Sequence, residues 1–98
     1  MRRGTTPTLT FTLPVDPSII ECLFITFSQN REIILEKNIN DCEFIDGALQ
    51  VTLSQKETLS FNVGAIDTQI RLKTNDGSAM ASNVVVAEIR NCLKDGEI

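Results

Sequence analysis

The residues that most often carry catalysis are sparse in this 98-residue chain, which contains no histidine. Without an imidazole, neither a Ser-His-Asp nor a Cys-His arrangement can be assembled. The three cysteines, Cys22, Cys42 and Cys92, are widely spaced and form no Cys-x-x-Cys pair. A zinc site would need all three thiolates and a carboxylate, whereas reduced thiols pack readily as small apolar groups. We therefore expect neither a metal site nor a cofactor.

Carboxylate pairs are the remaining source of acid–base chemistry. Asp41 with Glu43, and Asp95 with Glu97, have a spacing that usually belongs to a solvated strand face or a turn. Asp76-Gly77 and Asp95-Gly96 suggest calcium loops, but no further oxygen ligands follow either pair at loop spacing. The sequence therefore predicts a protein without catalytic residues, not an enzyme.

The charge and hydropathy of the chain exclude two classes of partner. Thirteen acidic and nine basic residues give a net charge of −4, and the only basic block is Arg2-Arg3, so we expect no nucleic-acid binding. No apolar run approaches the roughly 18 residues of a membrane-spanning helix. Met1-Arg2-Arg3-Gly4 is charged like the start of a signal peptide, but the polar Thr5-Thr6-Pro7-Thr8 follows it. We expect the protein to stay inside the cell that makes it.

The elements that position these residues have a period of two, as in strands with one buried face. We expect strands at 8–13, 20–28, 32–37, 42–45, 48–53, 66–74 and 80–93. Ile20, Cys22 and Phe24 stand in the opposite phase from Leu23, Ile25 and Phe27, so this strand has either a bulge or two covered faces. The expected core comprises Leu9, Phe11, Leu13, Ile25, Phe27, Leu49, Val51, Leu53, Ile70 and Leu72, with all five phenylalanines, Cys22, Ile33 and Leu35 also facing inward.

Turn signals separate these strands. Residues 28–31, Asp46-Gly47 and residues 75–78 predict hairpins, because glycine and asparagine tolerate positive φ. Ser54-x-x-Glu57 has the form of a capping box and predicts a single helical turn. The segment 82–93 leaves two interpretations open: its β-branched valines favour a strand, whereas its charges also tolerate a helix. Cys92, in this segment, is the thiol expected to be accessible.

Seven to eight short strands with regular turn signals predict one all-β domain, residues 1–98, folded as an antiparallel two-sheet Ig-like β-sandwich. A compact barrel is the alternative. The uncharged stretch from Met80 to Val86 places β-branched side chains on both faces, so a second surface should cover it. We therefore expect a homo-oligomer, with Val84, Val85 and Val86 as the candidate interface.

Several segments carry a resemblance to a known group. They are Arg3-Gly4-Thr5-Thr6-Pro7-Thr8 leading into Phe11-Thr12-Leu13-Pro14; Ile25-Thr26-Phe27-Ser28-Gln29; Leu35-Glu36-Lys37; residues 51–61, VTLSQKETLSF; and Gln69-Ile70-Arg71-Leu72. The chain resembles small structural proteins from bacteriophage and prophage tail gene clusters of Gram-positive bacteria. Its layout is similar to the Ig-like N-terminal module of phage baseplate upper proteins.

The resemblance implies a non-catalytic tail or baseplate component with other tail or baseplate proteins as partners. It implies a location in the virion, after assembly in the bacterial cytoplasm. No long C-terminal extension follows the sandwich, so a receptor-binding part is expected on another chain. The alternative function is a small acidic prophage-encoded protein that binds and regulates or inhibits a host protein.

Overall fold

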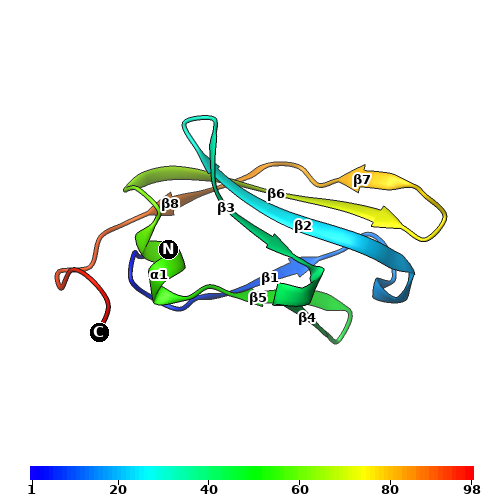
Figure 1. Cartoon of the computed structure of the whole chain (residues 1–98), viewed down its shortest axis with the longest axis horizontal. Helices are drawn as coiled ribbons and strands as arrows, with labels where there is room; N and C mark the ends of the chain where they lie inside the picture. The colour runs from blue at the N-terminus through cyan, green and yellow to red at the C-terminus, as the bar shows by residue number, and fades with distance from the viewer.

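The computed structural model describes all 98 residues, and the chain folds into two layers of antiparallel strands (Figure 1). The strands are β1 (Thr8–Thr12), β2 (Ile20–Gln29), β3 (Glu32–Asn38), β4 (Cys42–Ile45), β5 (Ala48–Thr52), β6 (Gly64–Thr74), β7 (Ala79–Ala81) and β8 (Val85–Ile89). One short helix, α1 (Gln55–Leu59), and two 3₁₀ turns, at Pro17–Ile19 and Ile39–Asp41, connect them. This architecture confirms the expected all-β sandwich of seven to eight strands.

The two sheets differ in size. The small sheet has the order β1-β5-β4, and the large sheet has the order β3-β2-β6, with β7 and β8 both paired to β6. β2 therefore pairs with both β3 and β6 in one sheet. In an immunoglobulin constant domain, by contrast, the second and third strands belong to different sheets. The chain shares the sandwich architecture of Ig-like domains with its own order of strands.

The core lies between the sheets and contains twelve buried apolar residues. They are Ile20, Leu23, Ile25, Phe27, Leu49, Val51, Leu53, Phe61, Ile66, Ile70, Leu72 and Ile89. Seven of the ten core residues predicted from the sequence are among them. Leu9, Phe11 and Leu13 are only partly buried against this core, because β1 is an edge strand of the small sheet with no neighbour on its outer side.

A bulge near the start of β2 resolves the two phases of its sequence. Ile20 pairs with Thr74 and Cys22 pairs with Lys73, so Glu21 is the extra residue. The bulge lets Ile20 face the core while Cys22 and Phe24 point outward. The predicted bulge is confirmed, but the core placement of Cys22 is wrong, since its thiol is half-buried on the outer face. Phe24 is 42% exposed on the same face, so the expectation that all five phenylalanines face the core is also wrong.

A second bulge corrects the placement of Ile33. The β2–β3 hairpin turns at Asn30 and Arg31, which both have positive φ, as a type I′ turn requires. Phe27 pairs with Leu35, but Ser28 pairs with Ile33, so Ile34 is the extra residue in β3. Leu35 therefore faces inward as predicted, and Ile33 faces outward with 61% exposure instead of entering the core.

The elements of the last third of the chain are strands and include no helix, which excludes the helical interpretation of 82–93. The predicted strand over 80–93 is nevertheless too long. Residues 82–84 interrupt it between β7 and β8, where the Ser82 amide and hydroxyl bond to the backbone of Ile70. β8 ends at Ile89, and residues 90–98 are exposed.

Two buried polar side chains hold the end of the sandwich near α1. The Thr58 hydroxyl accepts a hydrogen bond from the Gly4 amide at 2.9 Å and donates to the Thr5 carbonyl at 2.9 Å. The side-chain amide of Gln29 donates through Nε2 to the backbone carbonyl of Asn62 at 2.6 Å, and its Oε1 accepts from the backbone N–H of Asn62 at 2.8 Å. Because buried polar groups stabilise a fold only when they are paired, these contacts fix the N-terminal segment and the α1–β6 connection to the core.

The opposite orientations of two phenylalanines on β2 give a stability prediction. Phe27 is fully buried against the ring of Phe61, with 5.7 Å between the ring centroids. Phe27→Ala should lower the free energy of unfolding by about 3–5 kcal/mol, because it leaves a cavity as well as losing apolar contact. Phe24→Ala, on the outer face, should cost less than about 1.5 kcal/mol. Equal losses in a denaturant titration would contradict the assigned phase of β2.

Candidate functional site

Two of the carboxylates singled out in the sequence, Asp41 and Asp76, serve turns. The Asp41 carboxylate accepts a hydrogen bond from the Asn38 amide at 3.0 Å and caps a 3₁₀ turn. The Asp76 carboxylate accepts hydrogen bonds from the Thr74 hydroxyl and the Ser78 amide, and these bonds lower the pKa of Asp76. No group of three or more cysteine, aspartate or glutamate side chains is placed to hold a metal ion. None of the helices is long and apolar enough to cross a membrane.

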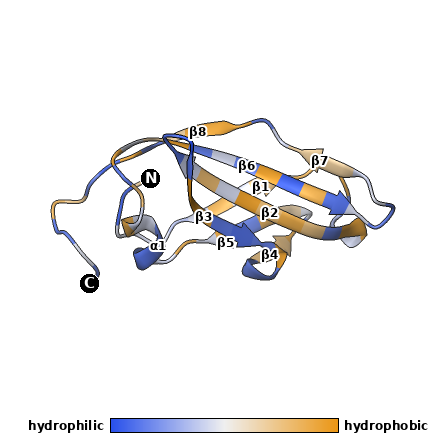
Figure 2. Ribbon diagram, turned by 45° about the horizontal axis from the view of Figure 1, so that its top comes forward, coloured by the Kyte–Doolittle hydropathy of each residue, from blue (hydrophilic) through white to orange (hydrophobic).

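The predicted interface forms an exposed apolar edge, which we call the valine edge and define as Val84, Val85 and Val86. These side chains are 52%, 56% and 64% exposed. Figure 2 shows an orange, hydrophobic stretch in β8, although the strand also contains the charged Glu88. Val85 shares the inward phase of Ala87 and Ile89, yet the small sheet leaves it uncovered. Val86 points outward beside Asp67 of β6.

The N-terminal residues pair with the outer side of the chain only beyond the valine edge, at Glu88 and Arg90. The Met1 amino group donates to the Glu88 carbonyl, the Arg90 amide donates to the Met1 carbonyl, and the Arg3 amide donates to the Arg90 carbonyl, each at 2.9 Å. The backbone groups of Glu88 and Arg90 therefore point away from β6. Those of Val86, two residues earlier in the same strand, point the same way and have no partner strand. This edge thus accepts an added strand, and the position at Val86 is open.

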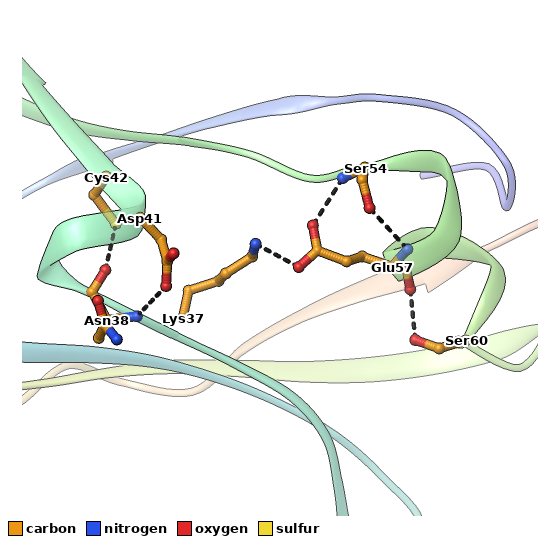
Figure 3. A network of polar contacts seen from close by, with 7 residues as sticks. All are labelled: Lys37, Asn38, Asp41, Cys42, Ser54, Glu57 and Ser60. Atoms are coloured by element: carbon orange, nitrogen blue, oxygen red, sulfur yellow. Dashed lines mark hydrogen bonds and ion pairs between the residues drawn. The ribbon is translucent and has the colours of Figure 1, made fainter.

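The opposite edge of the large sheet, β3, is closed. Its bulge at Ile34 interrupts a regular ladder, and Lys37 points inward because it pairs with the buried Ile25. Lys37 forms an ion pair with Glu57 of α1, as Figure 3 shows. Bulges and inward-pointing charges on edge strands prevent pairing with other chains. The two edges therefore differ in kind, and only the valine edge is apolar and open.

The Lys37–Glu57 contact also completes a helix cap. The Ser54 amide donates to the Glu57 carboxylate at 2.8 Å, and the Glu57 amide donates to the Ser54 hydroxyl at 3.1 Å. Partial burial by itself would raise the pKa of Glu57. The hydrogen bond and charge of Lys37 and the hydrogen bonds to Ser54 outweigh burial, so the pKa of Glu57 lies below its usual value of 4.5. The capping box predicted from the sequence is confirmed.

A second exposed surface lies on the outer face of the large sheet. This outer groove has a volume of about 530 Å³ and crosses β2, β3, β6 and the start of β7. Its apolar part comprises Phe24, Ile33 and Ala79, and its polar part includes Glu36, Gln69 and Arg71. The sequence analysis missed this groove because it placed Phe24 and Ile33 in the core. The opposite phase of Phe24 relative to Ile25 and Phe27 was the signal that could have found it.

The three thiols lie apart from one another and are all free. Cys22 lines the outer groove, and Cys92 is exposed in the segment after β8, as predicted. Partial burial, with a smaller effect from the Asp41 carboxylate, raises the pKa of Cys42. A thiol with a raised pKa is a poorer nucleophile, because the thiolate is the reactive form.

The depressed pKa of Glu57 predicts how stability depends on pH. The Lys37–Glu57 contact stabilises the fold above about pH 4.5, and this contribution is lost as the pH falls through the lower folded-state pKa. Glu57→Gln should therefore unfold at lower urea concentration than the wild type at pH 7, and this difference should shrink steadily below pH 4.5. The exposed Glu43→Gln should match the wild type throughout. A Glu57→Gln difference that is independent of pH would contradict the ion pair.

Comparison with known proteins adds no relative to this picture. The chain matches no protein-family model, and no curated protein or solved structure matches it. The candidate function therefore has to be argued from the residues and surfaces described above.

Proposed function

We propose that this protein is a non-catalytic structural or assembly component of a bacteriophage or prophage tail or baseplate. Three features support the proposal: the sequence resemblance to small tail-cluster proteins, the sandwich architecture, and two exposed apolar surfaces on the large sheet. The protein acts by binding other chains, in the virion and during assembly in the bacterial cytoplasm. Its partners are further copies of itself and other tail or baseplate proteins.

The observation that carries the proposal is the difference between the two edges of the large sheet. An open apolar edge favours pairing with another chain, and soluble proteins usually block such edges. Here β3 is blocked by a bulge and an ion-paired lysine, whereas Val86 retains a free N–H and C=O beside exposed valines. Val85 and Val86 point to opposite faces of the sheet. A partner strand at this position would cover both, because its own side chains also alternate between the two faces.

The location of the chain tests the proposed function directly. Particles released from cells that encode the chain should contain it after density-gradient purification, in a fixed ratio to the major tail protein. Particles from a strain with this gene deleted serve as the control and should lack complete tails. If the chain is found only outside the particles, the tail assignment is wrong. That outcome would favour the alternative function, a small acidic binding protein that regulates a host protein.

The valine edge gives a separate prediction about association. The wild type should scatter light with a mass above the 10.8 kDa of one chain at high concentration and should approach that mass on dilution. Val86→Lys should weaken this association at least tenfold, since a charge on an edge strand opposes pairing. Val63→Lys is the matched control, because Val63 is 57% exposed but lies outside any strand. If Val86→Lys associates like the Val63→Lys control, the valine edge is not an interface.

A further inference from the structure

The outer groove combines an exposed aromatic ring with an unpaired cation. Phe24 of β2 and Arg71 of β6 are directly opposite each other in the antiparallel register, so their side chains emerge side by side on the outer face. Thr26 and Gln69 form the next pair, and Cys22 and Lys73 form the pair on the other side. The Cβ atoms of an apolar and a positively charged side chain are thus about one strand spacing, 5 Å, apart in the groove.

Arg71, like Arg31 and Lys56, makes no ion pair or side-chain hydrogen bond, and it is the one of these three cations that lines the outer groove. The three ion pairs join Lys37 to Glu57, Lys73 to Glu21, and Arg90 to Glu88. Arg2 and Arg3 donate hydrogen bonds to backbone carbonyls. The guanidinium of Arg71 makes neither kind of contact, so all its N–H donors are free to bind a carboxylate in two-pronged geometry.

The complementary arrangement occurs at the other end of the same molecule. Residues 90–98 follow β8, and every one of them is exposed. Leu93 in this segment is fully exposed, and Asp95 follows it by two residues. The backbone bends at Leu93 and Lys94. In an extended segment, side chains two residues apart would point to the same side, separated by about 7 Å. Straightened in this way on docking, the segment would present the apolar side chain of Leu93 and the carboxylate of Asp95 together.

We propose that the C-terminal segment of one copy docks into the outer groove of a second copy. Leu93 packs on Phe24 and Ile33, while the Asp95 carboxylate binds Arg71. This proposal rests on the proposed assembly function and names a surface and a partner for it. The match is one of hydropathy and charge: the groove offers apolar surface beside the unpaired Arg71, with Glu36 also in its lining, and the segment offers an apolar side chain and a carboxylate.

The segment cannot reach the groove of its own chain. It runs past α1, where the Ile98 amide donates to the Gln55 side chain at 2.9 Å and the Gln55 amide donates to the Ile98 carbonyl at 3.4 Å. Figure 1 shows this end of the chain beyond α1, below the large sheet, whereas the groove lies on the outer side of that sheet. The contact is therefore between copies. Since it joins two different surfaces, it either closes reciprocally in a two-fold dimer or repeats into a ring or a filament.

A charge exchange tests the contact. All variants carry Val86→Lys, which removes pairing through the valine edge. In this background the weight-average mass in sedimentation should still rise with concentration. Arg71→Glu and Asp95→Arg, made singly, should each return the mass to that of one chain, and the double variant Arg71→Glu/Asp95→Arg should restore the rise. Arg31→Glu, a matched change on the β2–β3 turn, should have no effect.

Two results of this experiment would overturn the inference. One is a constant mass of 10.8 kDa for the Val86→Lys protein at every concentration, and the other is single variants that associate like the control. Both leave the particle experiment untouched, so failure of this contact is distinct from failure of the proposed function. Far-ultraviolet circular dichroism should show the same strand spectrum for all variants, since both substituted side chains are exposed.

The native cysteines provide an independent measurement of the same contact. Cys22 lines the groove and Cys92 precedes Leu93, so docking brings them close in neighbouring copies. With Cys42→Ser and Val86→Lys present, a flexible bis-maleimide should link Cys22 of one copy to Cys92 of another, giving dimers if the contact is reciprocal and larger species if it repeats. Because each link needs both thiols, either Cys22→Ser or Cys92→Ser should abolish crosslinking altogether. An absence of crosslinks, or dimers that persist with Cys92 alone, would contradict the docking.

Discussion

The phase of β2 is the constraint on which the rest of the structure depends. β2 is paired on both sides, so each of its residues is committed to the core or to the outer face, and its neighbours follow by register. Leu23, Ile25 and Phe27 enter the core, and Cys22 and Phe24 are forced outward. A shift by one residue would exchange the two sets and expose the core. The bulge at Glu21 lets Ile20 also face the core, although its position in the sequence belongs to the opposite phase.

The same register creates the outer groove. Because Phe24 and Arg71 are cross-strand neighbours, the exposure of the first determines the surroundings of the second. The core contacts of Leu23 and Ile25, the residues on either side of it, hold Phe24 in this position, so the surface is maintained by burial on the other side of the strand.

The unequal sizes of the sheets create the valine edge. The small sheet has three strands, whereas the large sheet has four positions, with β7 and β8 sharing the last one. The inward-facing Val85 therefore has no opposing strand. At the opposite edge, β3 can carry an inward charge because α1 supplies Glu57 as its partner. One edge of the sheet is thus satisfied within the chain, and the other remains available to another chain.

The sequence by itself determined the fold class, because side-chain alternation and turn residues are local signals. It placed the Asp46-Gly47 hairpin, the Ser54–Glu57 capping box, and the buried faces of β5 and β6, each decided by residues next to one another in the chain. It also singled out Val84, Val85 and Val86, which are exposed in the structure.

Only the tertiary structure decided what lies on the outer face. Cys22, Phe24 and Ile33 are apolar, and composition alone assigns apolar residues to the core. Two bulges, at Glu21 and Ile34, set their phase. The sequence raised the first only as one of two interpretations and did not indicate the second, because a bulge forms only when two strands are paired. The interruption between β7 and β8 has the same origin, since the contacts of Ser82 with Ile70 form only after the strands have come together. Register is a property of a pair of strands, so the sequence of one strand cannot specify it.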